Sequence, residues 1–126
     1  MKKIIFGLFI TLSSLMYSQE KHCSDFKIGN FIYKDAPYTG WTVVRGDSLQ
    51  VESNKSLNWH VEGTVKWISE CKYELTYTKA VSDDLIGKTV YVEIVEIKEN
   101  EIICRSTLDG VQFDFRMEKI ASINGH

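Results

Sequence analysis

The three cysteines, Cys23, Cys71 and Cys104, are the residues of this chain whose chemistry is most informative. In an oxidising compartment one disulfide forms and one thiol is left over, and three pairings are possible. A bond from Cys23 to Cys71 would close a loop of roughly 48 residues and stabilise the fold by about 3 to 4 kcal/mol. Cys104 lies in "EIICRST" on the same strand face as Ile102, which is typical of a small buried apolar side chain. We therefore predict a disulfide between Cys23 and Cys71.

The other residues with catalytic or metal-binding chemistry form no recognisable pattern. The histidines are too scattered for a metal site by spacing: His22, His60 and His126. Asp83 and Asp84 in "VSDDLIGK" lack the regular spacing of a calcium loop. Cys104 has no neighbouring histidine to activate it as a nucleophile. We predict a protein that is not an enzyme and that uses no metal and no cofactor.

The first 18 residues are typical of a secretory signal peptide. Two lysines precede an apolar run from Ile4 to about Met16, and the small residue Ser18 stands before Gln19. The run is shorter than the roughly 20 apolar residues of a membrane-spanning helix. We expect a signal peptide at 1–18 and a single domain at 19–126. The protein would then be exported, periplasmic or secreted, without stable membrane insertion.

The charge of the chain argues against nucleic acid as a partner. The sequence has 15 Lys and Arg residues against 17 Asp and Glu residues. Cleavage after residue 18 would remove Lys2 and Lys3, so the mature net charge would be about −4. No basic run reverses this locally, so a phosphate backbone would not be attracted. A mature chain of ~108 residues is enough for one domain with one core.

Short runs of β-branched and aromatic residues alternate with turn residues along the chain. We expect strands near 26–33, 41–45, 48–53, 57–68, 71–79, 88–98, 101–107 and 111–118. Most of the connecting turns are too short for a crossover, so successive strands run antiparallel. No helical segment is available to cover an apolar sheet face. We therefore predict an all-β, up-and-down meander of about eight strands that forms a barrel or a strongly curled sheet, and favour the barrel.

The alternation of residue types predicts which side chains face inward. Val111, Phe113, Phe115 and Met117 share one face of the last predicted strand. In "VYVEIVEIK" the apolar phase slips between Ile94 and the next residue. A β-bulge at this point would let the apolar residues on both sides of the slip face the interior.

Two segments resemble a family of short exported bacterial proteins of unknown function. Their patterns are Cys-x-Asp-Phe-Lys-x-Gly-x-Phe and, later, Trp-x-x-x-Cys-x-Tyr-x-Leu. The matching residues here are Cys23, Asp25, Phe26, Lys27, Gly29, Phe31, Trp67, Cys71, Tyr73 and Leu75. The resemblance implies a lipocalin-like β-domain with Cys23 and Cys71 as its fixed cysteine pair. Some members carry the name DNA topoisomerase IV, which the short length, acidic charge and missing nucleotide-binding loop of this chain contradict.

Seven aromatic side chains are predicted to face the interior and to line any ligand site: Phe31, Trp41, Trp59, Trp67, Tyr73, Phe113 and Phe115. A barrel of about eight strands either is filled by side chains or holds one small ligand. We expect a non-catalytic module that binds a small apolar ligand. The alternative is a structural or interaction protein of the cell envelope. It would have a filled core and would bind an envelope protein through a sheet edge or a loop such as "KDAPYTGW".

Overall fold

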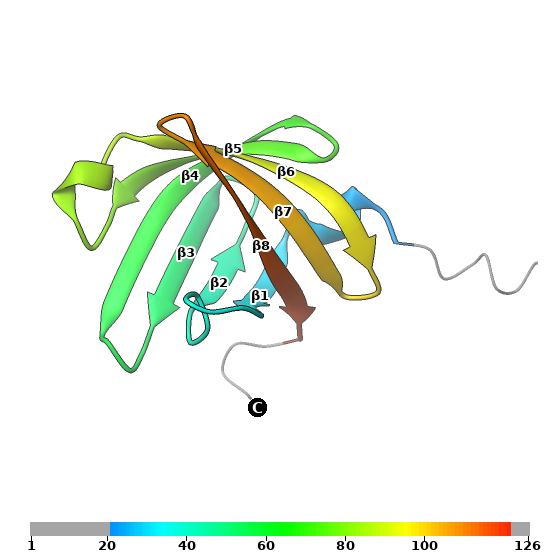
Figure 1. Ribbon diagram of the computed structural model, residues 1–126, viewed down its shortest axis with the longest axis horizontal. Coiled ribbons are helices and arrows are strands. Elements are labelled where there is room, and N and C mark those ends of the chain that lie inside the picture. The colour runs from blue at the N-terminus through cyan, green and yellow to red at the C-terminus, as the bar shows by residue number, and fades with distance from the viewer. Residues whose placement is uncertain (1–20, 122–126) are drawn as a thin grey trace, which may run out of the picture.

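A computed structural model describes residues 21–121 of the chain, so the predicted signal peptide lies outside the described residues. Eight antiparallel strands form a closed up-and-down barrel, in which β8 pairs with β1 (Figure 1). The strands are β1 (Gly29–Tyr33), β2 (Thr42–Arg45), β3 (Leu49–Asn54), β4 (Trp59–Ser69), β5 (Lys72–Lys79), β6 (Thr89–Lys98), β7 (Glu101–Leu108) and β8 (Val111–Ile120). The predicted all-β meander is confirmed, and it closes rather than remaining a curled open sheet.

The first strand is shorter than the sequence pattern predicted. It begins at Gly29 instead of residue 26, because the preceding residues form the 3₁₀-helix η1 (Cys23–Phe26). The backbone N–H of His22 donates to the carboxylate of Asp25 at 2.8 Å and so caps this helix. Gly29 has a φ of +150°, which glycine adopts readily, and a Cβ there would lie 2.7 Å from Cε of Lys119.

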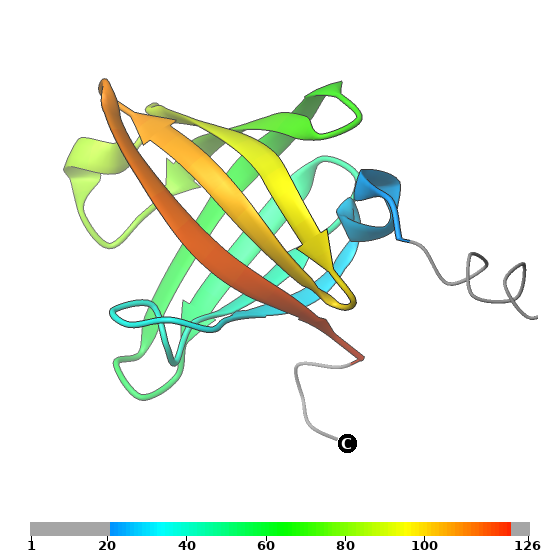
Figure 2. The same ribbon diagram turned by 45° about the vertical axis from the view of Figure 1, so that its right-hand side comes forward.

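The meander gives the barrel two different ends. The closed end carries η1 and the β2–β3, β4–β5 and β6–β7 turns. The open end carries residues 34–41, 55–58, 80–88 and 109–110, including the 3₁₀-helix η2 (Asp83–Leu85). Figure 2 shows η1, in blue, at the right and the open-end loops at the left. No helix within residues 21–121 is long and apolar enough to cross a membrane.

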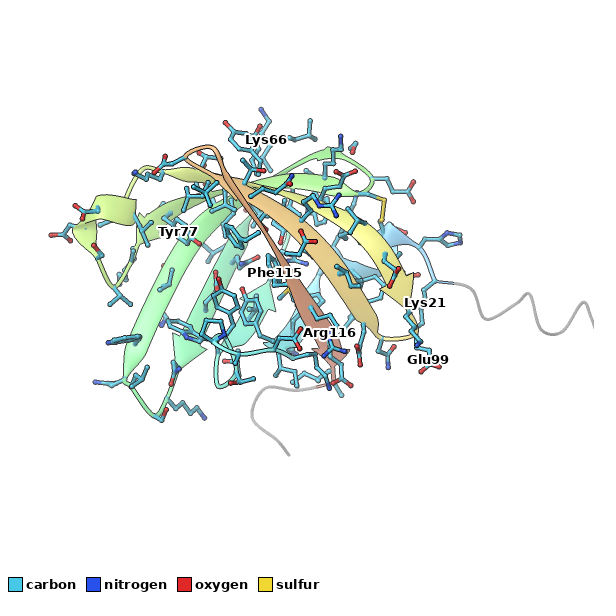
Figure 3. The ribbon with its side chains drawn as sticks, in the orientation of Figure 1. Lys21, Lys66, Tyr77, Glu99, Phe115 and Arg116 are labelled. Carbon is cyan, nitrogen blue, oxygen red and sulfur yellow. A yellow bond between two sulfur atoms is a disulfide. The ribbon has the colours of Figure 1, made fainter. Side chains whose placement is uncertain are left out.

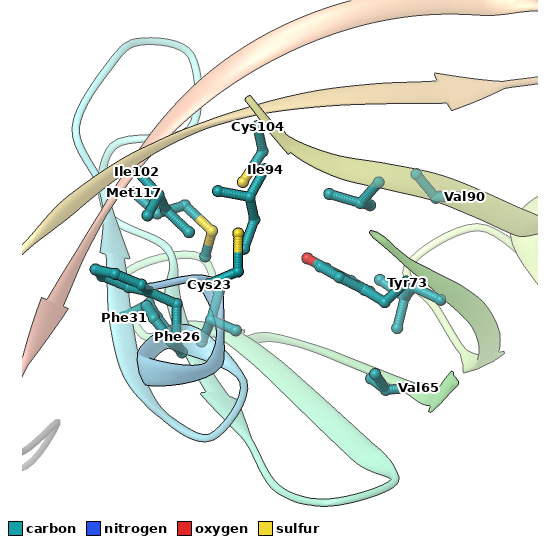
Figure 4. Packing of buried hydrophobic residues seen from close by; sticks show 13 residues of the cluster. Cys23, Phe26, Phe31, Val65, Tyr73, Val90, Ile94, Ile102, Cys104 and Met117 are labelled. Carbon is teal, nitrogen blue, oxygen red and sulfur yellow. The ribbon is translucent and has the colours of Figure 1, made fainter. Parts of the chain in front are cut away.

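The closed half of the barrel is filled by buried side chains. They come from η1 and from inward-facing positions of several strands, and they pack together next to η1 (Figure 4). The most deeply buried apolar members are Phe26, Phe31, Val43, Ile102, Cys104 and Met117. Since neighbouring strand residues point to opposite faces, core residues on one strand lie two positions apart, as Val90, Val92 and Ile94 do on β6.

A disulfide staples η1 to the barrel. It joins Cys23 to Cys71, whose Cα atoms are 5.3 Å apart, so the predicted pairing is confirmed. Cys71 lies in the turn before β5 at the closed end, one residue before the strand that was predicted to begin at residue 71. Cys104 is a free, buried cysteine. A structural disulfide is typical of a protein in an oxidising compartment.

The bulge predicted in β6 is present. Ile94 pairs with Cys104, whereas Glu96 pairs with Ile103, so the register skips Val95. The expectation that the apolar residues on both sides of the slip face inward is only partly correct. Ile97 packs against the core, but Val95 is the additional residue and its side chain is exposed.

Candidate functional site: an aromatic cavity with a buried carboxyl group

A cavity of about 360 Å³ occupies the open half of the barrel. Its walls combine aromatic and small aliphatic side chains from seven strands and from the two long open-end loops. Figure 3 shows Tyr77 and Phe115 inside the barrel, whereas Arg116 lies on the outside. The aliphatic and small lining residues are Val61, Leu75, Val81, Leu85, Val90, Val92 and Ser106. An eight-stranded barrel is just wide enough to be filled by large side chains, so these small inward residues leave room for a ligand.

The aromatic side chains of the cavity pack against one another. The ring centroids of Trp41 and Trp59 are 6.0 Å apart, and those of Tyr33 and Phe115 are 5.4 Å apart in an edge-to-face arrangement. Tyr33 also contacts Tyr38, at 5.5 Å. These separations are the ones that aromatic pairs prefer. The rings therefore form a wall from the loop at residues 34–41 down into the barrel.

The structure separates the seven aromatic residues predicted from the sequence into two groups. Trp41, Trp59, Phe113 and Phe115 line the cavity. The remaining residues, Phe31, Trp67 and Tyr73, face inward but do not line it. They lie in the closed half, around Arg45. Alternation predicts the face of a strand residue, but its height along the barrel axis depends on the register between strands.

Arg45 lies at the centre of the closed half and is only 1% exposed. Its guanidinium donates to the backbone carbonyls of residues 26–27 at 2.8 and 3.0 Å. It also donates to Oε1 of Gln50 at 2.9 Å and to the hydroxyl of Tyr73 at 3.1 Å. The guanidinium carbon lies 4.6 Å from the ring centroid of Phe31, which adds a cation–π contact. Arg45 is the last residue of β2 and also the last residue of the strand predicted at 41–45.

Glu52 connects this buried arginine to the cavity. Gln50 donates to Oε2 of Glu52 at 3.2 Å, and the hydroxyl of Tyr33 donates to Oε1 at 3.0 Å. Glu52 lines the cavity and is half-buried. Burial raises the pKa of its carboxyl above the usual range, although both hydrogen bonds and the charge of Arg45 act in the opposite direction.

Sequence reasoning missed Gln50 and Glu52 because β3 has an inverted pattern. Leu49 is 47% exposed, while Gln50 is 3% exposed. The alternation of polar and apolar residues in "LQVESN" is visible in the sequence. However, the usual assignment of apolar residues to the inner face is wrong for this strand. The buried Arg45 on β2 and the hydroxyl of Tyr33 on β1 make a polar inner face favourable here.

Ser106 adds a second polar group to the cavity wall. It lies on β7, lines the cavity and is 0% exposed. Within residues 21–121, its hydroxyl has no hydrogen-bond partner. A buried hydroxyl without a partner costs about 1 to 3 kcal/mol. The hydroxyl is enclosed in the cavity wall, so a polar atom of a bound molecule would reach it only after a shift of the neighbouring side chains.

The remaining titratable groups do not indicate catalysis. Burial raises the pKa of the Cys104 thiol to about 12, so this cysteine stays protonated. Burial also raises the pKa of Tyr73 to about 12, so its phenol is a neutral hydrogen-bonding group. His60 lies on the outer surface, 2.6 Å from Glu62. Among residues 21–121, no three His, Cys, Asp or Glu side chains lie close enough to hold a metal ion.

Fold and site together define a small β-barrel with an internal aromatic cavity, to which residues 21–121 contribute the carboxyl group of Glu52. No family model, no curated protein and no solved structure matches this chain. The resemblance of its two cysteine-containing segments to a family of short exported proteins stays a prediction.

Proposed function

We propose that this protein is a non-catalytic binding module that takes up a small, mainly apolar ligand in the cavity. The observation that carries the proposal is the contrast between the two halves of one barrel. The closed half is filled by packed side chains, whereas the open half has an aromatic lining around about 360 Å³ of space. Apolar side chains around an unfilled space lose packing contacts, and a ligand of matching size would restore them.

We further propose that the protein acts outside the cytoplasm, in the periplasm or after secretion. The disulfide between Cys23 and Cys71 supports this compartment, since such bonds persist in oxidising surroundings. The lysine-led apolar segment at residues 1–18 also supports it.

The alternative of an envelope interaction protein with a filled core has less support. Within residues 21–121 every strand is paired on both sides, so the barrel offers no sheet edge to a partner strand. The alternative assigns a docking role to the loop at residues 34–41. This loop contributes Tyr38 and Trp41 to the cavity.

The proposal is tested with a variant that fills the cavity. Val90 is buried and lines the cavity, so Val90→Phe would occupy ligand space. Val44 is exposed on β2, so Val44→Phe is the matched control. A series of neutral aryl alcohols is titrated while tryptophan fluorescence is recorded, because Trp41 and Trp59 line the cavity. We expect saturable binding to the wild type and to Val44→Phe, and about tenfold or more weaker binding to Val90→Phe. Absence of saturable binding, or equal binding to all three proteins, would contradict the proposal.

A further inference from the structure

We propose that the ligand is an organic amine, a molecule with an apolar body whose ammonium group binds to Glu52. This inference rests on the proposed function, because it specifies the ligand class of the same cavity. Three features support it: the charges of the cavity lining, the hydrogen bonds of Glu52 and the aromatic rings that line the cavity.

The charge of the lining is one-sided. Among the described residues that line the cavity, Glu52 is the only Asp, Glu, Lys, Arg or His side chain. Arg45 does not balance it there, because the guanidinium is directed to the closed end and bound by four acceptor groups. An anionic ligand would meet a carboxylate and no cation, and a neutral ligand would leave that carboxylate buried without an ion pair.

The carboxyl group of Glu52 is positioned but not saturated. Each of its oxygens accepts one hydrogen bond, from Tyr33 and from Gln50. An ionised carboxylate has about four acceptor sites, so roughly two remain for a ligand. An ammonium group supplies about three donors and a full positive charge, which matches these sites.

The aromatic wall adds attraction for a cation. The indole rings of Trp41 and Trp59 lie side by side at 6.0 Å, and tryptophan faces bind cations best among the aromatic side chains. Tyr33, which holds the Glu52 carboxyl, also contacts the ring of Phe115. An amine bound at Glu52 would lie beside Tyr33, whose ring contacts Phe115, and the indole pair lines the same cavity.

Ser106 provides independent support for a ligand with polar atoms. It lies on β7, four strands away from β3 in a closed barrel of eight strands. Ser106 and Glu52 therefore belong to opposite walls of the cavity. Because the Ser106 hydroxyl is buried without a partner among the described residues, a purely apolar ligand would leave it unsatisfied.

The test compares three probes with the same phenylbutyl body and different head groups: phenylbutylamine, phenylbutanol and phenylpentanoate. Binding to the wild type is measured by isothermal titration calorimetry at neutral pH. We expect the amine to bind about tenfold or more tightly than the alcohol, and the carboxylate to bind most weakly.

The same titrations with Glu52→Gln assign the preference to this residue. The amine should lose its advantage, so that the amine and the alcohol bind within about twofold of each other. Glu74→Gln is the matched control. Glu74 lies between the buried residues Tyr73 and Leu75 on β5, so its side chain is on the outer face, and the substitution removes the same charge from outside the cavity. This control should keep the preference for the amine.

The other possible results overturn one or both of the proposals. Binding of the alcohol as tightly as the amine, or tightest binding of the carboxylate, overturns the amine inference and leaves the apolar binding site in place. Binding of none of the three probes contradicts both. If Glu52→Gln fails to fold, the order of the three affinities in the wild type still decides, since it needs no variant.

Discussion

The charges of Arg45 and Glu52 lie inside the barrel and are connected through the side chain of Gln50. Arg45 is enclosed by acceptors and aromatic rings, so its charge stabilises the closed half. Glu52 has fewer partners and lies at the boundary between the filled half and the cavity. Arg45 and Glu52 are therefore the two ends of one hydrogen-bonded network. The Arg45 end stabilises the closed half, and the Glu52 end faces the cavity, where a ligand can bind.

The stability of the protein should depend on the ionisation of Glu52. The pKa of this carboxyl is raised in the folded state above its ordinary value of 4.5, so the ionised form destabilises the folded state above the folded pKa. This penalty disappears as the pH falls through the raised pKa to below 4.5. Glu52→Gln should therefore be more stable than the wild type at neutral pH, and the difference should vanish near pH 4.

Urea unfolding of both proteins over a series of pH values measures this difference. Asp35 and Glu62 have lowered pKa values and also contribute to the acid dependence, but they are common to both proteins and cancel. A difference in stability that does not change with pH would contradict the assignment to Glu52.

Arg45→Leu should lower the free energy of unfolding by about 2 to 5 kcal/mol. The substitution leaves two backbone carbonyls and the side chains of Gln50 and Tyr73 without their donor. Arg105→Leu is the control, because Arg105 forms an exposed ion pair with Asp114 that contributes about 1 kcal/mol or less. Urea unfolding measures both, and equal losses would show that Arg45 does not organise the core.

At the scale of elements, η1 depends on contacts with the barrel. A 3₁₀-helix of four residues has little stability of its own. It is held by the disulfide, by Arg45 and by Nζ of Lys119, which donates to the carbonyl of Asp25 at 2.6 Å. With these contacts η1 closes one end of the barrel and contributes Phe26 to the core.

Cys71→Ser should lower the free energy of unfolding by about 2 to 5 kcal/mol, because it removes the staple of η1. Cys104→Ala removes only a buried sulfur and should cost about 1 kcal/mol. Thermal unfolding measures the stabilities, and thiol labelling reports Cys23 as newly reactive in Cys71→Ser. Equal losses in both variants would contradict a structural role of the disulfide.

At the scale of the whole molecule, the barrel combines a packed half and a hollow half. Loops at the open end have few buried contacts, and η2 contains no buried residue. Local stability follows buried contacts. The closed half should therefore be the more stable part of the molecule, and the open half should be the part that responds to a ligand.

Hydrogen exchange should show this difference directly. Amides in the Ile94 half of β6 should exchange more slowly than amides of residues 80–88 at the open end. Saturating phenylbutanol should slow exchange around Val90 and Tyr77, which line the cavity, and leave the slow amides near Arg45 unchanged. Equal exchange rates in the Ile94 half of β6 and in residues 80–88, or ligand-induced slowing confined to the closed end, would contradict this account.

The barrel itself was largely predictable from local sequence. Alternation over the last strand identified Phe113, Phe115 and Met117 as one face, because the period of a strand is two residues. Short turns made neighbouring strands antiparallel, since a parallel connection needs a longer crossover. The pairing of Cys23 with Cys71 followed from loop length and from the buried character of Cys104.

The division of the barrel into a packed and a hollow half required the folded chain. Trp41 and Tyr73 both face inward, yet one lines the cavity and the other contacts Arg45. Alternation assigns a residue to a face, whereas its height in the barrel comes from the register of every strand pair around the closed sheet. The same closure brings Glu52 and Ser106 to opposite walls of one cavity, although they lie far apart along the chain. Which side chains of distant strands share one cavity depends on the register of all the strand pairs, so no local pattern contains this information.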